Sequence, residues 1–235
     1  MAFDPQNVGR RGFLGAAAAA ASAAVGARAL AHEREIVPGE FANQLALTPS
    51  QIEGPFYPNP LPLTQDNDLL VLGDSMTEAV GEVTHLHGQV LSATGEPLRN
   101  ATVEIWQADA TGAYLHPGSE GHAQRDKHFQ GFGRFETASD GRYAFRTVKP
   151  GKYPGRTPHI HVLVNYKGKR LVTSQLYIRG HAQNRRDGSL MSIRNLQMRQ
   201  NVLIDFAPLP GSKVKQLIAR ADLIVGGLPN GPEHE

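Results

Sequence analysis

Hydrophobic and polar residues alternate with a period of two in several short runs between residues 81 and 225. In the run at 101–108, Val103 and Ile105 alternate with Glu104 and Trp106. Successive side chains of a strand point to opposite faces of its sheet, so this pattern predicts half-buried β-strands. The predicted strands are residues 83–91, 101–108, 142–148, 159–165, 173–178 and, at a sheet edge, 220–225.

Turn residues separate these runs. The segment GEPLRN at 95–100 and the pairs Asp140-Gly141 and Pro150-Gly151 are typical of turns. The chain contains 25 glycines and 16 prolines, and only residues 189–202 carry a helical pattern, which is weak. Short strands between Gly- and Pro-rich turns favour an all-β fold. We therefore predict a single β-sandwich domain over residues 81–226, followed by a flexible tail at 227–235.

The segment before the strands, residues 32–80, is rich in Pro, Asn, Asp and Gly and shows little periodicity. Three prolines lie within residues 48–58, which excludes a regular helix because proline lacks the backbone donor and clashes with the preceding turn. We predict an irregular N-terminal arm that is ordered against the sandwich.

Residues 1–31 have the features of a cleavable export signal. Arg10-Arg11 precedes an alanine-rich stretch that runs to Gly26, and Ala29-Leu30-Ala31 supplies a small-residue cleavage pattern before His32. The apolar stretch is about 14 residues long, whereas a spanning helix needs ~20. The sequence predicts export by the twin-arginine machinery to the periplasm or beyond, with no membrane span after processing. The alternative is an amphipathic or buried alanine helix.

Composition and charge narrow the possible functions. The hydrophobic fraction of 40% and charged fraction of 20% are ordinary for a soluble globular protein. The chain has no cysteine, which excludes disulfides, thiolate metal sites and thiol nucleophiles. Residues 1–31 hold three arginines and one aspartate, so their removal lowers the formal net charge from +2 to zero. Without a basic surplus or patch, we expect no nucleic-acid binding.

Two of the chain's histidine pairs have a spacing that suits a metal. His85-Leu86-His87 and His159-Ile160-His161 each place two imidazoles on one face of a predicted strand. The spacing alone is more typical of structural or surface histidines. The second pair differs because it follows a Gly- and Pro-rich loop at residues 151–158.

Tyrosines in loops accompany that second pair. Tyr153 and Arg156 lie in the loop just before His159, and Tyr114 lies in another loop at 111–116. Functional side chains are commonly found on loops that a rigid β scaffold positions. On pattern alone, packing roles for the two tyrosines remain the simpler interpretation.

Several longer motifs resemble the intradiol ring-cleavage dioxygenases, the family of protocatechuate 3,4-dioxygenase and catechol 1,2-dioxygenase. The resemblance runs from about Thr48 to Gly180. It is carried by EGPFYP at 53–58, the HGQV…PLRNATVEIWQAD…GAY run at 87–114, GRFETASDGRYAFRTVKPGKYP at 133–154, RTPHIH at 156–161 and SQLYI at 174–178.

The resemblance implies a set of site residues. In that family two tyrosines and two histidines bind iron, and the matching positions here are Tyr114, Tyr153, His159 and His161. The family's active-site arginine falls on Arg156, and its glutamine before the Leu-Tyr pair falls on Gln175. The implied cofactor is Fe(III), and the implied substrates are an aromatic diol and O2.

The chemistry of Fe(III) explains this choice of residues. It is a hard cation that suits oxygen donors, while imidazole also binds iron well. A bound trivalent metal deprotonates a phenol whose ordinary pKa is about 10. By resemblance, the diol displaces Tyr153, whose phenolate takes up a substrate proton. Arg156 then stabilises negative charge on the ring, and Gln175 orients Arg156 or the bound oxygen. The product is a muconate-type dicarboxylic acid that contains both atoms of O2.

Two other functions remain open at this stage. A non-catalytic transthyretin-like or regulatory β-sandwich would account for the strand and turn motifs, but it leaves the Tyr114, Tyr153 and HIH set as coincidence. A zinc hydrolase would use the histidine pairs, but residues 149–186 contain no acidic side chain to serve it.

Some details are not assigned by the motifs. Tyr57 either lines the substrate mouth or packs on the sandwich, while Trp106 is expected in the core and His116 is not expected to be catalytic. The stretch at 32–48 is too short for the long helical segment of catechol and hydroxyquinol dioxygenases, which favours a protocatechuate-like architecture. The substrate is a catechol, a carboxylated catechol or a lignin-derived phenol, and a homo-oligomer is one of the assemblies that the sequence allows.

Overall fold

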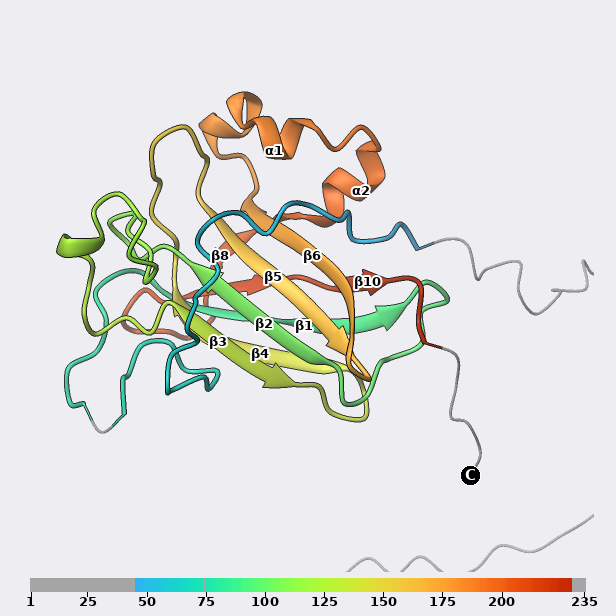
Figure 1. The fold of residues 1–235 in the computed structure, drawn as a ribbon, viewed down its shortest axis with the longest axis horizontal. Helices are drawn as coiled ribbons and strands as arrows, with labels where there is room; N and C mark the ends of the chain where they lie inside the picture. Colours follow the sequence, from blue (N-terminus) through green and yellow to red (C-terminus); the bar gives the residue numbers. More distant parts are fainter. Residues whose placement is uncertain (1–44, 74, 230–235) are drawn as a thin grey trace, which may run out of the picture. The chain divides into compact units, whose positions relative to one another are not determined.

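The first sheet is built around the long strand β1 (Val83–Ser92). The structure is a computed structural model, and it describes residues 45–73 and 75–229, all within one compact unit. β1 pairs antiparallel with one neighbour and parallel with two others, which lie end to end along its opposite edge (Figure 1). The other strands of this sheet are β4 (Arg142–Val148), β8 (Phe206–Pro208), β9 (Leu217–Arg220) and β10 (Leu223–Val225).

The second sheet has the order β3-β2-β5-β6-β7 and carries the candidate site residues of the strands. Its members are β2 (Thr102–Gln107), β3 (Phe132–Glu136), β5 (His159–Tyr166), β6 (Lys169–Ile178) and β7 (Leu203–Ile204). The register places Trp106 of β2 and Gln175 of β6 on either side of His161. Cross-strand neighbours share a face of a sheet, so these three side chains lie on one face.

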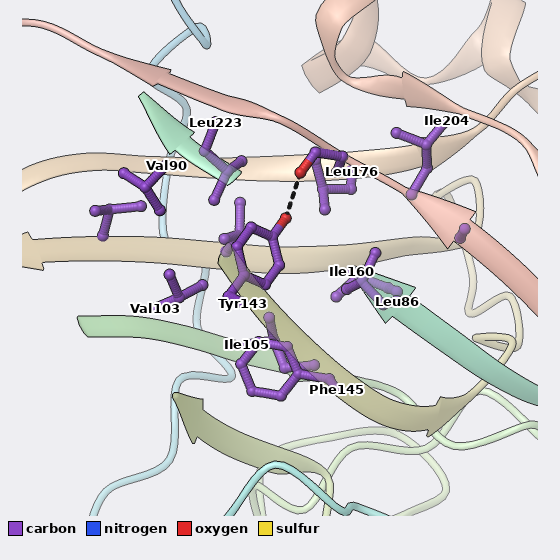
Figure 2. Close-up of a cluster of buried hydrophobic side chains, with 14 of the residues drawn as sticks. Leu86, Val90, Val103, Ile105, Tyr143, Phe145, Ile160, Leu176, Ile204 and Leu223 are labelled. Atoms are coloured by element: carbon purple, nitrogen blue, oxygen red, sulfur yellow. Dashed lines mark hydrogen bonds between the residues drawn. The ribbon is translucent and has the colours of Figure 1, made fainter. Parts of the chain in front are cut away.

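The hydrophobic core fills the space between the two sheets (Figure 2). Leu86, Tyr143 and Phe145 come from the first sheet, and Ile105 and Ile160 come from the second; all are at most 2% exposed. Alternation along the strands supplies these inward positions, as the sequence predicts. The all-β sandwich expected from the sequence is confirmed.

The strand predicted at 220–225 is wrong in detail, because two strands replace it. β9 ends at Arg220 and β10 begins at Leu223. Between them the backbone of Ala221 approaches Gly88, where an added Cβ would lie 1.7 Å from the Ala221 carbonyl oxygen. That oxygen accepts a 2.6 Å hydrogen bond from the buried Tyr143 hydroxyl, drawn in Figure 2. Glycine at position 88 is thus required by a close backbone approach.

The sequence also missed β3, β7 and β8, which have two to five residues each. Such runs hold too few alternations for periodicity to reveal them. The strands predicted at 83–91, 101–108, 142–148 and 159–165 match β1, β2, β4 and β5 to within two residues at each end, and β6 begins four residues before the predicted 173.

The weak helical pattern at 189–202 corresponds to two short helices instead of one. These are α1 (Gly188–Met191) and α2 (Leu196–Asn201), preceded by the 3-10 helix η2 (Ala182–Arg186); another, η1 (His122–Gln124), lies in a loop between β2 and β3. Asn195 accepts hydrogen bonds from the backbone N–H groups of Gln197 and Met198, so a new helix begins there. Ile193, which lies between the two helices, is buried in a small hydrophobic cluster with Tyr177.

Residues 45–61 run over the outer face of the second sheet (Figure 1). Their backbone is tied to β6: Gln51 N donates to Thr173 O at 2.8 Å, and Ser174 Oγ donates to Pro49 O at 2.7 Å. Residues 65–70 then lie beside β3 and β4, where Leu69 N donates to Arg146 O at 2.8 Å, and Leu69 enters the core between the sheets. The predicted export signal at 1–31 and residues 230–235 of the predicted tail lie outside the described residues. Among those described, no helix has the length and apolar character to cross a bilayer.

Candidate metal centre

The two histidines of β5 point out of the sheet, away from the core. His159 and His161 are each 2% exposed, and their Nε2 atoms lie 3.1 Å apart. Nδ1 of His159 lies 2.7 Å from the carbonyl oxygen of Thr157. In the neutral imidazole that contact puts the proton on Nδ1, so the lone pair of Nε2 faces the second histidine.

Tyr114 reaches the same point from the loop after β2. Its hydroxyl lies 3.4 Å from His159 Nε2, and the side chain is 1% exposed. The carboxylate of buried Asp109 accepts hydrogen bonds from the N–H groups of Thr111 and Ala113 and thereby folds the loop. Gly112 has a φ of 100°, and a Cβ there would lie 2.1 Å from the Lys152 carbonyl oxygen. Glycine therefore lets the Tyr114 loop pack against the loop that carries Tyr153.

Tyr153 completes the group from the loop between β4 and β5. Its hydroxyl also lies 3.4 Å from His159 Nε2, and its ring meets that of Tyr114 edge-on at 5.4 Å between centroids. Tyr153 is half-buried, whereas Tyr114 is fully enclosed. The structure thus brings together the four side chains that the sequence proposed as ligands, with one of the two tyrosines nearer to solvent.

Burial has the largest effect on the pKa of each of these four side chains. Burial, aided by the nearby charge of Arg156, lowers the pKa of His159 to about 4, and burial together with His159 holds the pKa of His161 well below its ordinary value. Burial also raises the pKa of Tyr114 well above 10, and it raises that of Tyr153, where Arg156 acts in the opposite direction. The site therefore presents two neutral imidazoles and two phenols.

The arrangement fits a metal ion. A first-row metal binds imidazole nitrogen at about 2.0–2.1 Å, so donors that share it at angles of 90–110° lie roughly 2.9–3.4 Å apart. The three separations from His159 Nε2, at 3.1 Å and twice 3.4 Å, fall in that range. Neutral imidazoles are ready to bind, and a trivalent cation offsets the cost of ionising two buried phenols. Oxygen and nitrogen donors without sulfur suit Fe(III).

The remaining two predicted site residues form a chain of hydrogen bonds that starts at Tyr153. Arg156 Nη1 donates to the Tyr153 hydroxyl at 3.2 Å, and its Nη2 donates to Gln175 Oε1. Gln175 is fully buried and uses its amide nitrogen to donate to the backbone of Ile52 at 3.1 Å. Arg156 therefore lies between a candidate ligand and the segment that covers the sheet.

Aromatic side chains cover the histidines on the outer face. Trp106 stacks on His161 with 4.7 Å between ring centroids and 12° between planes, and it is fully buried, as expected, in the smaller hydrophobic cluster on this face. Tyr57 meets Trp106 edge-on at 5.0 Å, and Phe56 lies 4.9 Å from the Tyr114 ring. The Tyr57 hydroxyl donates to Glu104 Oε2 at 2.9 Å, which gives Tyr57 a packing role.

Three functional neighbours escaped the sequence reasoning. Asp187 forms an ion pair with Arg156, Tyr177 donates to Gln175 Oε1 at 2.9 Å, and Gln51 donates to the Tyr177 hydroxyl at 2.8 Å. Tyr177 could have been found, because it lies two residues after Gln175 on the same strand face. Asp187 and Gln51 lie in irregular segments, where spacing gives no indication of a contact.

The other histidine pair is placed differently. His85 Nε2 lies 3.1 Å from Gln216 Oε1, and both His85 and His87 are half-buried on the outer face of the first sheet. In the part of the chain that the structure describes, no three or more His, Asp or Glu side chains are grouped to hold a metal ion. The four-donor group around His159 therefore depends on its tyrosines.

Comparison with known proteins gives a consistent family. Residues 52–203 match the family model described as Dioxygenase. The chain is 43% identical over 124 residues to the protocatechuate 3,4-dioxygenase beta chain of Burkholderia cepacia, covering 49% of this chain and 52% of that protein. It is 31% identical over 151 residues to catechol 1,2-dioxygenase of Acinetobacter baylyi, covering 57% and 47%. The chain thus spans about half the length of these curated relatives.

Among solved structures, the fold is similar to the dioxygenase domain of a dioxygenase–carbohydrate-binding protein fusion from Streptomyces sp. SirexAA-E. The two share 28% identity with a TM-score of 0.60, over 78% of this chain and 100% of that one. The family model covers most of the chain, and its matched range contains every residue of the four-donor group. This chain belongs to the intradiol ring-cleavage dioxygenase family.

Proposed function

We propose that this protein is a non-haem Fe(III)-dependent intradiol dioxygenase that cleaves catechol-type rings between the two hydroxyl-bearing carbons. The observation that carries the proposal is the convergence of two phenol oxygens and two imidazole nitrogens around His159 Nε2. The proposed iron ligands are Tyr114, Tyr153, His159 and His161. A non-catalytic β-sandwich gives no reason for this convergence, and a zinc hydrolase gives no role to the paired phenols.

The proposed reaction balances without a further reductant. One ring carbon–carbon bond breaks, and each of the two carbons gains one oxygen atom from O2. The diol loses four electrons, O2 accepts them, and the product is a muconate-type dicarboxylic acid that releases two protons at neutral pH. Bound iron(III) would supply Lewis acidity, which ionises the diol and draws electron density from the ring.

Tyr153 is the residue that exchanges for the substrate. It is half-buried, whereas Tyr114 is enclosed, so it has room to leave the centre. Once released, its phenolate oxygen accepts the proton of an incoming diol hydroxyl. The hydrogen bond from Arg156 Nη1, at 3.2 Å, stabilises that phenolate until the proton arrives.

Arg156 and Gln175 act on charge and orientation. The guanidinium is always cationic and lies on the Tyr153 side of the group, where it stabilises negative charge on the bound ring. Gln175 accepts from its Nη2 and is itself anchored to Ile52. Trp106 and Tyr57 exclude water on the His161 side, and Phe56 packs against the rings of Tyr114 and Tyr153.

Turnover in the presence of labelled oxygen tests this proposal. Purified protein loaded with iron should convert a catechol to a dicarboxylic acid that carries two atoms from ¹⁸O2, detected by mass spectrometry. A comparison of catechol, a carboxylated catechol and a lignin-derived diol identifies the preferred substrate. Ring opening beside the diol, or no conversion of any of these substrates, would contradict the proposal.

We also propose that the protein is exported by the twin-arginine machinery and cleaved after Ala31, and that it works as an oligomer. Support for export is the Arg10-Arg11 pair followed by the apolar stretch and the cleavage pattern. Changing both arginines to lysine should keep full-length protein in the cytoplasm with its iron, and unchanged processing would refute the export route.

Relatives named as alpha and beta chains support an oligomer, which light scattering can measure.

A further inference from the structure

Arg156 forms an ion pair with Asp187, a residue that takes no direct part in the proposed reaction. Asp187 follows η2 and precedes α1, and its side chain is fully buried, while that of Arg156 is 20% exposed. Asp187 Oδ2 accepts from Arg156 Nε at 2.9 Å and from the backbone N–H of Thr157 at 3.0 Å. One carboxylate oxygen therefore binds the arginine side chain and the chain segment that leads to His159.

The other oxygen of Asp187 anchors the carboxylate to a different element. Oδ1 accepts from the backbone N–H of Leu190 at 2.9 Å and so caps α1. The carboxylate is fixed on both sides, which makes it a rigid support for the guanidinium. A cap of this kind contributes about 1 kcal/mol to stability and could be supplied by Ser or Asn, so capping alone does not require a buried charge.

The charge of the pair is consistent with a support role. Burial would raise the pKa of Asp187, but hydrogen bonds from Arg156 and from the backbone of Leu190 and Thr157 bring it below its ordinary value. Asp187 is therefore ionised and paired. A buried ion pair is weak evidence for stability, because desolvation offsets the attraction, but it fixes two side chains in one arrangement.

The remaining donors of Arg156 show what that arrangement achieves. With Nε on Asp187 and Nη2 on Gln175, the guanidinium plane is set from two directions. Nη1 is then directed at the Tyr153 hydroxyl, 3.2 Å away. A free arginine side chain samples many rotamers, and holding it in one removes that cost from the reaction step.

We propose that Asp187 is the positioning residue that holds the Arg156 guanidinium beside Tyr153, at the edge of the four-donor group where the aromatic diol binds. This inference rests on the proposed function for the role of Arg156. Asp187 touches neither substrate nor metal in this account, and its effect on turnover passes through Arg156.

The central test is a double-mutant cycle. Asp187→Asn keeps the size of the side chain but removes the charge. Because asparagine has one oxygen in place of two, at least one N–H donor that binds the carboxylate would face an NH2 group. The variant should keep its iron while kcat falls roughly 10- to 100-fold, with a smaller change in KM. In an Arg156→Ala background the same change should have no further effect on kcat. An equal loss in both backgrounds, or full kcat in Asp187→Asn, would overturn the proposal.

A matched control separates positioning from capping. Asn195 caps α2 through the N–H groups of Gln197 and Met198. Asn195→Ala should lower stability by about 1 kcal/mol and leave kcat unchanged. If it lowers kcat as much as Asp187→Asn does, the helical segment acts as a whole and Asp187 has no special role.

Two further measurements keep the inference separable from the proposed function. A crystal structure of Asp187→Asn should show Nη1 of Arg156 moved away from the Tyr153 hydroxyl, whether or not the wild type turns over a diol; an unmoved guanidinium would refute the inference. Arg156→Lys retains charge but cannot bridge Asp187, Gln175 and Tyr153 together. It should recover little of the activity lost in Arg156→Ala, and wild-type activity would refute positioning even if Asp187→Asn fails to fold.

Discussion

Two strands of this protein, one in each sheet, carry a histidine pair with the same spacing. On β1 the residues alternate between half-buried and buried along the whole strand, and His85 and His87 occupy the half-buried positions. On β5 the first six residues are all buried, and His159 and His161 are among them. The strands differ because segments from elsewhere cover the outer face of the second sheet, while that of the first sheet meets water.

Each pair also has an arginine–aspartate pair beside it, and these differ in the same way. Arg220 and Asp222 lie 2.9 Å apart with 61% and 32% of their side chains exposed. Arg156 and Asp187 lie 2.9 Å apart with 20% and 0% exposed. Exposed ion pairs contribute little and are screened by salt, whereas a buried pair acts at low dielectric. The residue spacing places two imidazoles on one face of both β1 and β5. Only on β5 do segments from elsewhere in the chain cover that face and enclose a candidate site.

Removal of one imidazole from each pair should give the largest contrast. His161→Ala deletes a proposed ligand and leaves three donors, so iron content, visible colour and turnover should fall to background. His87→Ala should leave all three unchanged, because His87 lies on the water-facing side of β1. Metal analysis and absorption spectra of both variants check this expectation. Equal behaviour of the two variants would show that β5 holds no metal.

The two arginines provide the next contrast. Arg156→Ala should keep its iron and colour and still change its spectrum when a catechol binds without oxygen, while turnover falls roughly 10²–10³-fold. Arg220→Ala should turn over at the wild-type rate. Steady-state kinetics with metal analysis measure both. Loss of iron from Arg156→Ala would show a structural role, and undiminished turnover would contradict its assigned part.

A smaller effect, on stability, is expected for the hydrogen bond that joins the segment over the second sheet to β2. Tyr57→Phe removes the hydroxyl that donates to Glu104 Oε2, an acceptor that is buried and charged. The free energy of unfolding should fall by about 1–3 kcal/mol. Tyr166→Phe, at the half-buried end of β5, should change it by less than about 0.5 kcal/mol. Denaturant titration of the two variants compares them, and equal values would mean that this contact does not hold the cover.

The smallest expected effect is the contribution of His87 to the pH dependence of stability. Burial and the charges of Arg220 and Arg142 lower the pKa of His87, while Asp222 acts against them. Below pH about 6.5, His87 therefore binds a proton more readily in the unfolded chain than in the folded protein. The free energy of unfolding falls as pH falls through that value. His87→Gln should lose less stability than the wild type between pH 8 and pH 5. A larger loss in the variant would reverse the sign of this contribution.

The sequence predicts the sandwich well because its core follows alternation. Strands β1, β2, β4 and β5 are long enough for a period of two to be read, and their inward residues form the core. Strands of two to five residues are not visible in this way. The break between β9 and β10 depends on the approach of Ala221 to Gly88, a contact between distant segments that no local pattern records.

The candidate site was predictable only in part. Motif resemblance named Tyr114, Tyr153, Arg156 and Gln175, and strand periodicity placed His159 and His161 on one face. The structure adds what joins them: the Asp109 carboxylate that folds one loop and the Asp187 carboxylate that holds another. Both contacts follow from how irregular segments fold in three dimensions, and residue spacing does not encode them.

The metal content and colour of the purified wild-type protein test the central claim most directly. Two phenolate ligands on Fe(III) absorb visible light by charge transfer, so the account predicts a coloured protein with about one iron per chain. Its colour should shift when a catechol is added without oxygen, as the diol replaces Tyr153. Stoichiometric zinc, or an iron-replete protein that is colourless, would contradict the assignment of Tyr114 and Tyr153 as ligands and with it the proposed function.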